Sequence, residues 1–423
     1  MFFFPPYSYD YYLDRMSHII QWKRCILVLF LWSIWITLYL LDCTEPLNNK
    51  TANRTVSPQF LTKSTKPLPL ILYWTRNFPS YWLVDGDVNW IPKNPQKYCK
   101  NWNCEITTDE RLISNSSAVI FKDLVLDFEN IPKRSHSSQI YVYTQQDPPH
   151  IVRNAGKLEP LKTLADVFNL TMTYHENSDV QSTFGILVFL TETARLKPQY
   201  KKLKYPWVQF KDHLNLNWDY KPLSTNLNFT ELRKKIRNKT KMALWANTNT
   251  DLVESGRAEY IKELSQYFPV DLYSHNPGGK SCSVENCYEI WENDYKFYLA
   301  FENSFSKDYI TEKPYKIFTI STIPVVRGGA DYAKILPPKS YINAQDFESP
   351  KELASFLINL SEDASEYASY FDWKKDFGMV FFSGVGHDHD LHTVPCLCDL
   401  CDILNSPNIK TKVVHDIYAH VSQ

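Results

Sequence analysis

Residues 295–329 form the stretch YKFYLAFENSFSKDYITEKPYKIFTISTIPVVRGG. It contains two short apolar runs, residues 297–301 (FYLAF) and 323–326 (IPVV), and each is typical of a buried strand. A helix is expected between them, with Thr311 as its N-cap. Strand, helix and strand in this order predict two parallel strands, and ligands bind at the carboxyl ends of such strands. The polar residues before the helix therefore lie where a ligand site is expected.

The same pattern continues on both sides of this stretch. Helical apolar spacing occurs in residues 254–268 and 349–360, and the second segment begins with a Ser-Pro-Lys-Glu cap. Further runs that predict buried strands are residues 71–74, 118–121, 140–143 and 242–245. The alternation predicts an α/β protein with two doubly wound parallel sheets, divided near residues 222–230. We expect one domain over residues 67–225, a second over 226–404 and a C-terminal tail over 405–423.

Composition narrows the function. The chain has 423 residues, with 46 Lys and Arg against 47 Asp and Glu, which argues against an electrostatic surface for nucleic acid. Only 11 residues are Gly, and neither G-x-G-x-x-G nor G-x-x-x-x-G-K-[ST] occurs. If the protein binds a nucleotide, side chains must therefore hold its phosphates.

An apolar run near the N-terminus predicts a membrane anchor. Residues 25–41 (CILVLFLWSIWITLYLL) would span about 26 Å as a helix, enough for a thin bilayer. Lys23 and Arg24 precede the run and acidic residues follow it, so residues 1–24 are expected in the cytosol and the rest in the lumen. The alternative is a cleaved signal peptide, which has a shorter apolar stretch and ends in small residues. Residues 42–66, rich in Thr, Ser, Asn and Pro, are expected to form a flexible stem.

Two further patterns fit a lumenal location. Glycosylation sequons occur at Asn49, Asn53, Asn115, Asn169, Asn228, Asn238 and Asn359. In an oxidising lumen the cysteines of the folded part favour disulfides over zinc ligands, although Cys398-x-x-Cys401 also fits a metal motif. These cysteines are odd in number, so one thiol is left over: Cys99, Cys104, Cys282, Cys287, Cys396, Cys398 and Cys401.

The central stretch resembles the α1,3-fucosyltransferases through its strings YLAFENS, DYITEK and IPVV. Residues 168–180 (FNLTMTYHENSDV) and 330–373 follow the pattern of the same family, and the resemblance covers about residues 67–404. It implies a GT-B-like fold, in which two Rossmann-like domains face a cleft, with the acceptor on the first domain and GDP-fucose on the second. It also implies a single-pass type II protein of the Golgi membrane.

The resemblance assigns the donor site to residues of the second domain: Asn249, Arg257, Tyr298, Asn303, Tyr309, Glu312 and Lys313. Arg257 offers two parallel hydrogen bonds to pyrophosphate oxygens, and Lys313 offers a point charge. Together they would offset the negative charge that grows as GDP leaves. Tyr309 is expected to stack on or hydrogen-bond the nucleotide, and Glu312 to bind ribose hydroxyls or face the oxocarbenium-like sugar. Without the resemblance, Glu312 and Lys313 are also typical of a solvent-exposed helix start.

The position of the family's general base holds Gln146. Transfer from GDP-β-L-fucose to an α-linkage inverts the anomeric carbon, so a base must take the proton of the acceptor hydroxyl. The family has a Glu there, within Phe-Glu-Ser-Pro-x-His, whereas this chain has QQDPPH at residues 145–150. Gln146 cannot accept a proton at neutral pH. The substitutes that the sequence offers are Asp147, one residue further on, and His175.

No metal is required in this interpretation, because Arg257 and Lys313 already neutralise the diphosphate. Two strings, residues 85–87 (DGD) and 388–390 (DHD), match the D-x-D pattern of metal-dependent glycosyltransferases, so a divalent cation such as Mn²⁺ is expected at most to stimulate. The resemblance also implies disulfides between the closing cysteine pair and the first domain, with a local pair left over: Cys398 and Cys401 with Cys99 and Cys104, and Cys282 with Cys287.

The expected function is transfer of L-fucose from GDP-fucose, in α1,3 linkage, to a GlcNAc-containing glycan of a glycoprotein or glycolipid. The alternative, raised by Gln146, is a weak or inactive relative that binds GDP-fucose or glycan. The sequence leaves open whether the acceptor is the core of an N-glycan or a peripheral Lewis-type glycan.

Overall fold

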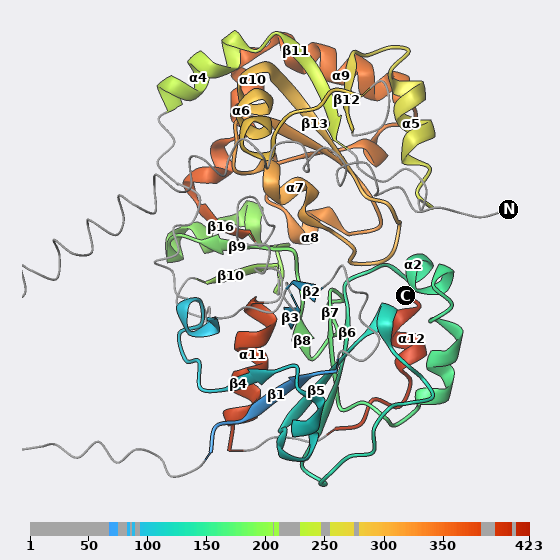
Figure 1. The fold of residues 1–423 in the computed structure, drawn as a ribbon. Helices are drawn as coiled ribbons and strands as arrows, with labels where there is room; N and C mark the ends of the chain where they lie inside the picture. The colour runs from blue at the N-terminus through green and yellow to red at the C-terminus, as the bar shows by residue number, and fades with distance from the viewer. Residues whose placement is uncertain are drawn as a thin grey trace, which may run out of the picture. The chain divides into compact units, whose positions relative to one another are not determined.

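The structure is a computed structural model, and it describes residues 67–74, 83–84, 87–88, 94–205, 207–210, 229–246, 254–274, 279–381, 394–407 and 412–423. Residues 66–423 form one compact unit (Figure 1). The expected cytosolic tail, anchor and stem lie outside the described residues. Among the helices in the described ranges, none is long and apolar enough to cross a membrane.

The first sheet is parallel throughout, in the strand order β4-β1-β5-β6-β7-β8. Its strands are β1 (Leu70–Tyr73), β4 (Glu105–Thr107), β5 (Ala118–Lys122), β6 (Ile140–Gln145), β7 (Leu170–Thr173) and β8 (Val180–Gln181). Apolar clusters cover both of its faces, so β5 and β6 are buried along their whole length. Two-sided burial explains why these strands appear in the sequence as continuous apolar runs.

The second sheet is also parallel, in the order β12-β11-β13-β14-β15. Its strands are β11 (Lys241–Ala246), β12 (Val270–Tyr273), β13 (Tyr295–Phe301), β14 (Ile323–Arg327) and β15 (Ile342–Asn343). Helices pack on both faces (Figure 1), which makes the sheet doubly wound. One face carries α4 (Phe229–Asn238), α5 (Arg257–Leu264), α9 (Pro350–Glu362) and α10 (Ala364–Ser369). The other carries α6 (Val284–Asp294), α7 (Glu312–Ile317) and α8 (Tyr332–Ile335).

The predicted strands of both sheets are confirmed, with ends that move by one or two residues. The helix predicted over residues 254–268 is shorter, because α5 begins only at Arg257. Gly256 precedes it with φ of 58°, a left-handed conformation that interrupts a right-handed helix. The helix predicted over residues 349–360 is confirmed as α9, and Ser349 caps it by accepting a hydrogen bond from the Glu352 N–H.

A third sheet was not predicted. It consists of β9 (Gly185–Phe189), β10 (Val208–Phe210) and β16 (Phe377–Phe381), with β16 antiparallel to β9. Its core side chains share one cluster with residues of the second sheet and its helices. Gly185 lies against α7, because a Cβ added there would come within 2.5 Å of the Tyr315 ring. Residues 185–210 therefore pack with the second half of the chain, not only with the domain predicted over residues 67–225.

The last part of the chain returns to the first sheet. Helix α11 (Val394–Asn405) packs on one face of that sheet, and α12 (Ile417–Val421) packs on the other. This corrects two expectations: α11 does not belong to the second domain, and residues 405–423 are not a free tail. The physical reason is the amphipathic spacing of the two helices, since Leu397, Leu400 and Ile417 are buried in the two clusters.

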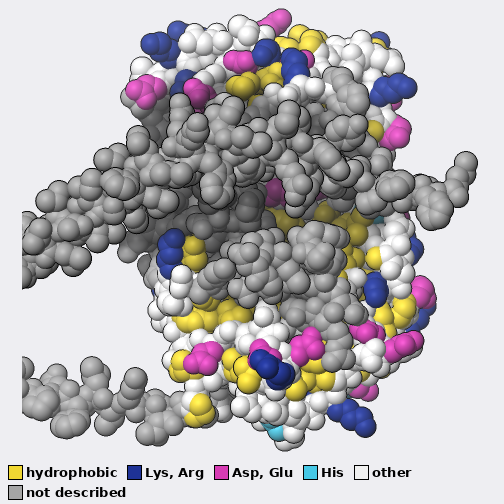
Figure 2. Space-filling model, in the orientation of Figure 1, with side chains coloured by type: hydrophobic (Ala, Val, Ile, Leu, Met, Phe, Trp, Pro, Cys, Tyr) yellow, Lys and Arg dark blue, Asp and Glu magenta, His cyan; other side chains and the backbone are white. Residues whose placement is uncertain are grey.

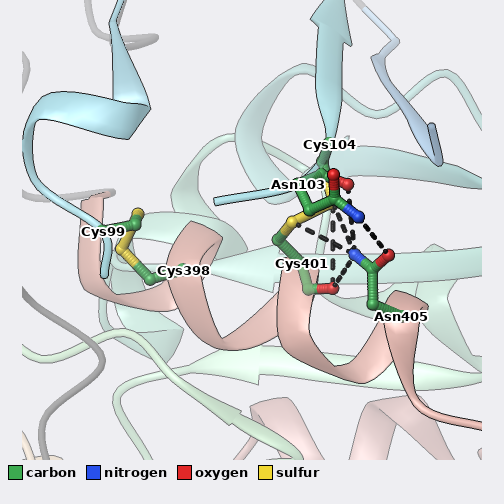
Figure 3. The surroundings of a disulfide bond; sticks show 6 residues. All are labelled: Cys99, Asn103, Cys104, Cys398, Cys401 and Asn405. Atoms are coloured by element: carbon green, nitrogen blue, oxygen red, sulfur yellow. Dashed lines mark hydrogen bonds between the residues drawn. A yellow bond between two sulfur atoms is a disulfide. The ribbon is translucent and has the colours of Figure 1, made fainter. Parts of the chain in front are cut away.

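Two disulfides fasten α11 to the first half of the chain (Figure 3). Cys99–Cys398 and Cys104–Cys401, which we call the long-range bridges, join residues 299 and 297 positions apart. Asn405 forms hydrogen bonds beside these bridges. Its amide donates to the carbonyls of Asn103 (3.2 Å) and Cys401 (2.9 Å) (Figure 3). The local bridge joins Cys282 and Cys287. The expected pairing is thus confirmed.

The cysteine left over from these pairs is Cys396, which remains a buried thiol on α11. Burial raises its pKa to about 12. The thiol therefore stays protonated at physiological pH.

Candidate active site

The loop after β13 is organised by a buried carboxylate. Glu302 follows the strand directly and is 1% exposed. It accepts hydrogen bonds from the Thr311 N–H (2.9 Å) and hydroxyl (2.8 Å), and from the Lys313 ammonium (2.7 Å). Thr311 is the N-cap residue of α7, as expected, but its hydroxyl donates to Glu302 and makes no capping hydrogen bond to the helix. Glu302 therefore fixes both the start of α7 and the position of Lys313.

Arg257 lies at the same edge of the second sheet. It is the first residue of α5, it is 4% exposed, and its Nη1 donates to the carbonyl of Phe301 at 3.1 Å. Burial lowers its pKa, an effect that the nearby carboxylate of Glu302 opposes. Since Phe301 and Glu302 are consecutive, the two predicted donor-site cations, Arg257 and Lys313, both lie at the carboxyl end of β13.

Three other predicted donor residues surround this point. Tyr298 is part of β13 and fully buried, with its ring 5.6 Å from that of Trp291. Tyr309 is 5% exposed and packs edge-to-face on Tyr174 at 5.1 Å. The Tyr298 hydroxyl and the Asn303 Oδ1 are buried and have no hydrogen-bond partner among the described residues. Buried polar atoms without partners are costly, so these two could be satisfied by the polar groups of a ligand.

Glu312 stays ionised throughout the physiological range. Burial raises its pKa, but Lys313 and Lys316 outweigh this and lower it to about 2. Its carboxylate lies 3.9 Å from the Lys313 ammonium. Glu312 is therefore an acceptor of hydrogen bonds from hydroxyls and not a proton donor.

At the carboxyl edge of the first sheet, the predicted catalytic residues follow β6. The Gln146 amide donates to the Ser182 hydroxyl at 3.1 Å, so this hydrogen bond fixes the orientation of the Gln146 side chain. The Asp147 carboxylate is 37% exposed, and its Oδ2 lies 3.6 Å from the Lys122 ammonium. Lys122 in turn lies 3.0 Å from Oδ1 of Asp123, which is buried directly after β5. Because β5 and β6 are neighbours, their carboxyl ends bring these groups together.

The structure argues against His175 as the base. Its ring is completely buried, 4.3 Å from the Tyr174 ring and 5.3 Å from the His420 ring. Burial, with smaller contributions from His420 and Lys307, lowers its pKa to about 3. A base must reach the hydroxyl that it deprotonates, and a fully buried ring cannot do so.

A contact between backbone and side chain links the two edges. The Glu176 N–H, beside Tyr174 and His175, donates to the Asp308 carboxylate at 3.1 Å. Asp308 has φ of 63°, an uncommon conformation for a residue with a side chain. The loop that carries Tyr309 is thus held against the first sheet.

Several expected sites lie outside the described residues, and others can be examined in the structure. Asn249 and the 388–390 string are outside them, as are Asn49, Asn53 and Asn228; of the 85–87 string only Asp87, in β3 (Asp87–Val88), is described. Among the described side chains no cluster could hold a metal ion. Of the described sequons, Asn115, Asn238 and Asn359 are exposed.

The sequon at Asn169 is the exception. This side chain is buried, accepts from the Tyr141 N–H (2.8 Å) and donates to the Lys412 carbonyl (2.9 Å). The folded domain has no room for a glycan there, which corrects that expectation.

Sequence reasoning did not identify two residues of the site. Glu302 was part of the recognised string, but nothing in the sequence showed that its carboxylate would bind Lys313. Asp123 stands two residues past the strand predicted over residues 118–121, and that position was the only available signal. On the face shown in Figure 2, the described Lys and Arg side chains are interspersed with Asp and Glu side chains.

Comparison with known proteins agrees with this geometry. The family model for the C-terminal part of glycosyltransferase family 10 (fucosyltransferase) matches residues 236–420, and the model for the fucosyltransferase N-terminal part matches residues 66–185. The α-(1,3)-fucosyltransferase C of Drosophila melanogaster is 32% identical over 366 residues, which cover 82% of this chain and 76% of that protein. A 4-galactosyl-N-acetylglucosaminide 3-α-L-fucosyltransferase of Pan troglodytes is 29% identical, over 75% of this chain and 76% of that protein.

A crystal structure of an α1,3-fucosyltransferase with GDP-fucose matches with a TM-score of 0.44 and 16% identity, over 86% of this chain and 96% of that one. That likeness is too low to bear on individual residues. The two family models and the relatives, which span both sheets, show that the chain belongs to the fucosyltransferases of glycosyltransferase family 10.

Proposed function

We propose that this protein transfers L-fucose from GDP-β-L-fucose, with inversion, to the O3 hydroxyl of a GlcNAc residue in a glycan. The main support for the proposal is that Arg257 and Lys313 both lie at the carboxyl end of β13, beside buried polar atoms that have no hydrogen-bond partner among the described residues. Membership of the fucosyltransferase family supports the donor, and the names of the relatives support the α1,3 linkage.

The donor edge binds and stabilises the leaving group. Arg257 presents a planar fork to the pyrophosphate, and Lys313 adds a charge that Glu302 holds in place. As the bond between C1 and the phosphate oxygen breaks, GDP departs with the electron pair, and both cations stabilise its growing charge. Ionised Glu312 accepts hydrogen bonds from donor hydroxyls. A divalent cation such as Mn²⁺ would at most add to this stabilisation.

The acceptor edge must remove a proton. The acceptor oxygen attacks C1 while its proton passes to a base, and Asp147 is the exposed carboxylate at the position next to Gln146. Gln146 itself cannot act, because its amide is neutral and its N–H group already binds Ser182. We therefore assign the base role to Asp147. The relatives give no support to the alternative of an inactive protein.

We further propose that residues 25–41 anchor the protein in the Golgi membrane, with residues 1–24 in the cytosol and a stem over residues 42–66. The apolar run, the preceding basic pair and the disulfides all support a lumenal location for the catalytic part. Protease protection of the lumenal part in sealed Golgi vesicles tests this topology. Digestion of the catalytic part without detergent would contradict it.

The enzymatic proposal is tested by GDP release from GDP-fucose, with N-acetyllactosamine or chitobiose as the acceptor. We expect acceptor-dependent release and an α1,3 linkage in the product, read by NMR.

Asp147→Asn should lower kcat/KM by about 100-fold or more with unchanged GDP-fucose affinity, because general-base catalysis contributes about that factor. The matched control Gln146→Ala should keep most activity. Donor binding without acceptor-dependent release would refute the proposal, and a gain of activity in Gln146→Glu would show that no base had been relocated. The two acceptors also distinguish Lewis-type from core activity.

A further inference from the structure

We propose that buried Asp123 is a positioning residue for the proton transfer: it draws the Lys122 ammonium away from Asp147 and so keeps Asp147 basic. This inference rests on the proposed function, in which Asp147 accepts the proton of the glycan hydroxyl. It adds Asp123, directly after β5, which is in none of the strings that carry the resemblance to the family.

The first argument for this role is the position of Lys122 at the ends of β5 and β6. The Lys122 ammonium stands between two carboxylates, 3.0 Å from Asp123 Oδ1 and 3.6 Å from Asp147 Oδ2. The shorter contact goes to Asp123, which the Leu124 N–H also holds, at 2.8 Å. A cation beside a carboxylate lowers its pKa and makes it a weaker base. Asp123 therefore takes up a charge that would otherwise weaken Asp147.

The second argument is the burial of Asp123 and Lys122. The Asp123 side chain is completely buried, and its Oδ2 has no hydrogen-bond partner among the described residues. A buried carboxylate oxygen without a partner is costly, so it calls for an explanation beyond stability. Lys122 is itself only 10% exposed, so the attraction between the two is little screened by solvent. Of the two carboxylates, only Asp147 is open to an acceptor.

Titration of Asp123 then becomes a switch on the base. The groups that face this carboxyl are Lys122, Asp147, Tyr143 and Tyr174. Burial raises the pKa of Asp123 to about 6, against the opposing effect of Lys122. Below that pH Asp123 is neutral, and Lys122 then pairs with Asp147 alone. A carboxylate that pairs with a cation is a weaker base, so the rate falls.

The test is the pH profile of kcat/KM for the full enzyme with N-acetyllactosamine. The wild-type enzyme should show an acidic limb near pH 6, with a fall of about three- to tenfold, as expected when a general base is weakened but not removed. Asp123→Asn should lack this limb and should show at pH 7.5 the low rate that the wild type shows at pH 5. GDP-fucose affinity, measured by calorimetry, should not change.

Asp376→Asn is the matched control. Asp376 is a mostly buried aspartate that binds the Lys197 ammonium at 2.7 Å on the third sheet, away from both edges. Its substitution should cost stability and leave the acidic limb intact. A wild-type profile that is flat from pH 7.5 to pH 5 overturns the proposal whether or not Asp123→Asn folds. So does an Asp123→Asn enzyme that keeps the limb. If Asp147→Asn retains full activity, it is the assignment of the base that fails.

Discussion

The two parallel sheets end in the same arrangement, a lysine between a buried carboxylate and a more exposed one, but the surroundings differ. At the second sheet, Glu302 is bonded to Thr311 and to Lys313, and the exposed partner Glu312 has its pKa lowered to about 2. At the first sheet, one carboxylate oxygen of Asp123 has no hydrogen-bond partner in the described part of the chain, and burial raises the pKa of this residue to about 6. One edge is therefore a fixed arrangement of charges, and the other changes charge near neutral pH.

The two sheets are also closed differently. The helices that cover the second sheet come from the same continuous half of the chain, and the local bridge there spans five positions. The first sheet is covered by α11 and α12 from the far end of the chain, and the long-range bridges fasten α11. The second sheet is therefore stabilised by neighbouring segments of the chain, whereas the first sheet depends on distant ones.

The largest expected effect concerns those bridges. Replacing all four cysteines of the long-range bridges by Ser should lower the free energy of unfolding by about 5 kcal/mol, because each bridge closes a very long loop. Removing either bridge alone should cost much less, since the other still closes nearly the same loop. The control is the Ser variant of the local bridge, with a cost of about 2 kcal/mol. Urea denaturation measures all three, and equal losses for the two bridge types would contradict this view of the first sheet.

The second prediction compares the buried carboxylates. Glu302→Gln should lower the free energy of unfolding at pH 7.5 by about 3–5 kcal/mol, because it leaves the mostly buried Lys313 without its close partner. Asp123→Asn should be at least as stable as the wild type, because it removes a buried charge while Lys122 keeps Asp147. Urea unfolding of the two amide variants tests this. A larger loss in Asp123→Asn would mean that the two edges are alike.

The third prediction uses pH and has opposite signs at the two edges. The pKa of Asp123 is raised on folding, so its contribution to stability is full below about pH 4 and is lost as the pH rises through 6. Relative to the wild type, Asp123→Asn should therefore gain on the order of 2 kcal/mol between pH 4 and pH 7.5. The pKa of Glu312 is lowered, so its contribution is present above about pH 4.5 and lost toward pH 2.

The control for this prediction is Glu312→Gln, whose deficit relative to the wild type should shrink below pH 4.5. Thermal unfolding as a function of pH reads both variants. The same sign of change in both would contradict the contrast between the edges.

The smallest expected effect is on donor affinity. Lys313→Ala should weaken GDP-fucose binding about tenfold, or about 1.4 kcal/mol, because Lys313 already shares its charge with Glu302. Lys122→Ala, the equivalent change at the first sheet, should leave donor affinity unchanged. Calorimetric titration with GDP-fucose measures both. A weaker affinity in Lys122→Ala would place the donor at the first edge as well.

Sequence reasoning predicted the parallel strands well, because two-sided burial leaves continuous apolar runs such as residues 118–121 and 140–143. It missed the third sheet because β9 and β16 are far apart in the chain, and such pairing has no local signal. It treated residues 405–423 as a tail because α12 is a single short turn of helix. Its apolar side chains are buried only by contact with the first sheet, which is distant in the sequence.

For the site, the resemblance brought Arg257 and Lys313 to one edge, as the structure has them. It did not predict that Lys313 would be bonded to Glu302, because a bond between residues 11 positions apart depends on the loop conformation. Asp123 could not be predicted as part of the site, since its importance lies in burial and in the position of Lys122. Composition and spacing identify neither.

The return of α11 and α12 to the first sheet has a consequence for biosynthesis. The ribosome delivers β1 early, because this strand ends at Tyr73, but the helices that cover its sheet begin only at Val394 and leave the ribosome last. The second sheet, whose strands and helices are contiguous, can close while the first still exposes side chains such as Ile71 and Val142. The first sheet, although made first, can therefore be completed only when α11 and α12 have been made and the long-range bridges have formed. The half of the protein that is made first thus exposes its apolar side chains for the longest time.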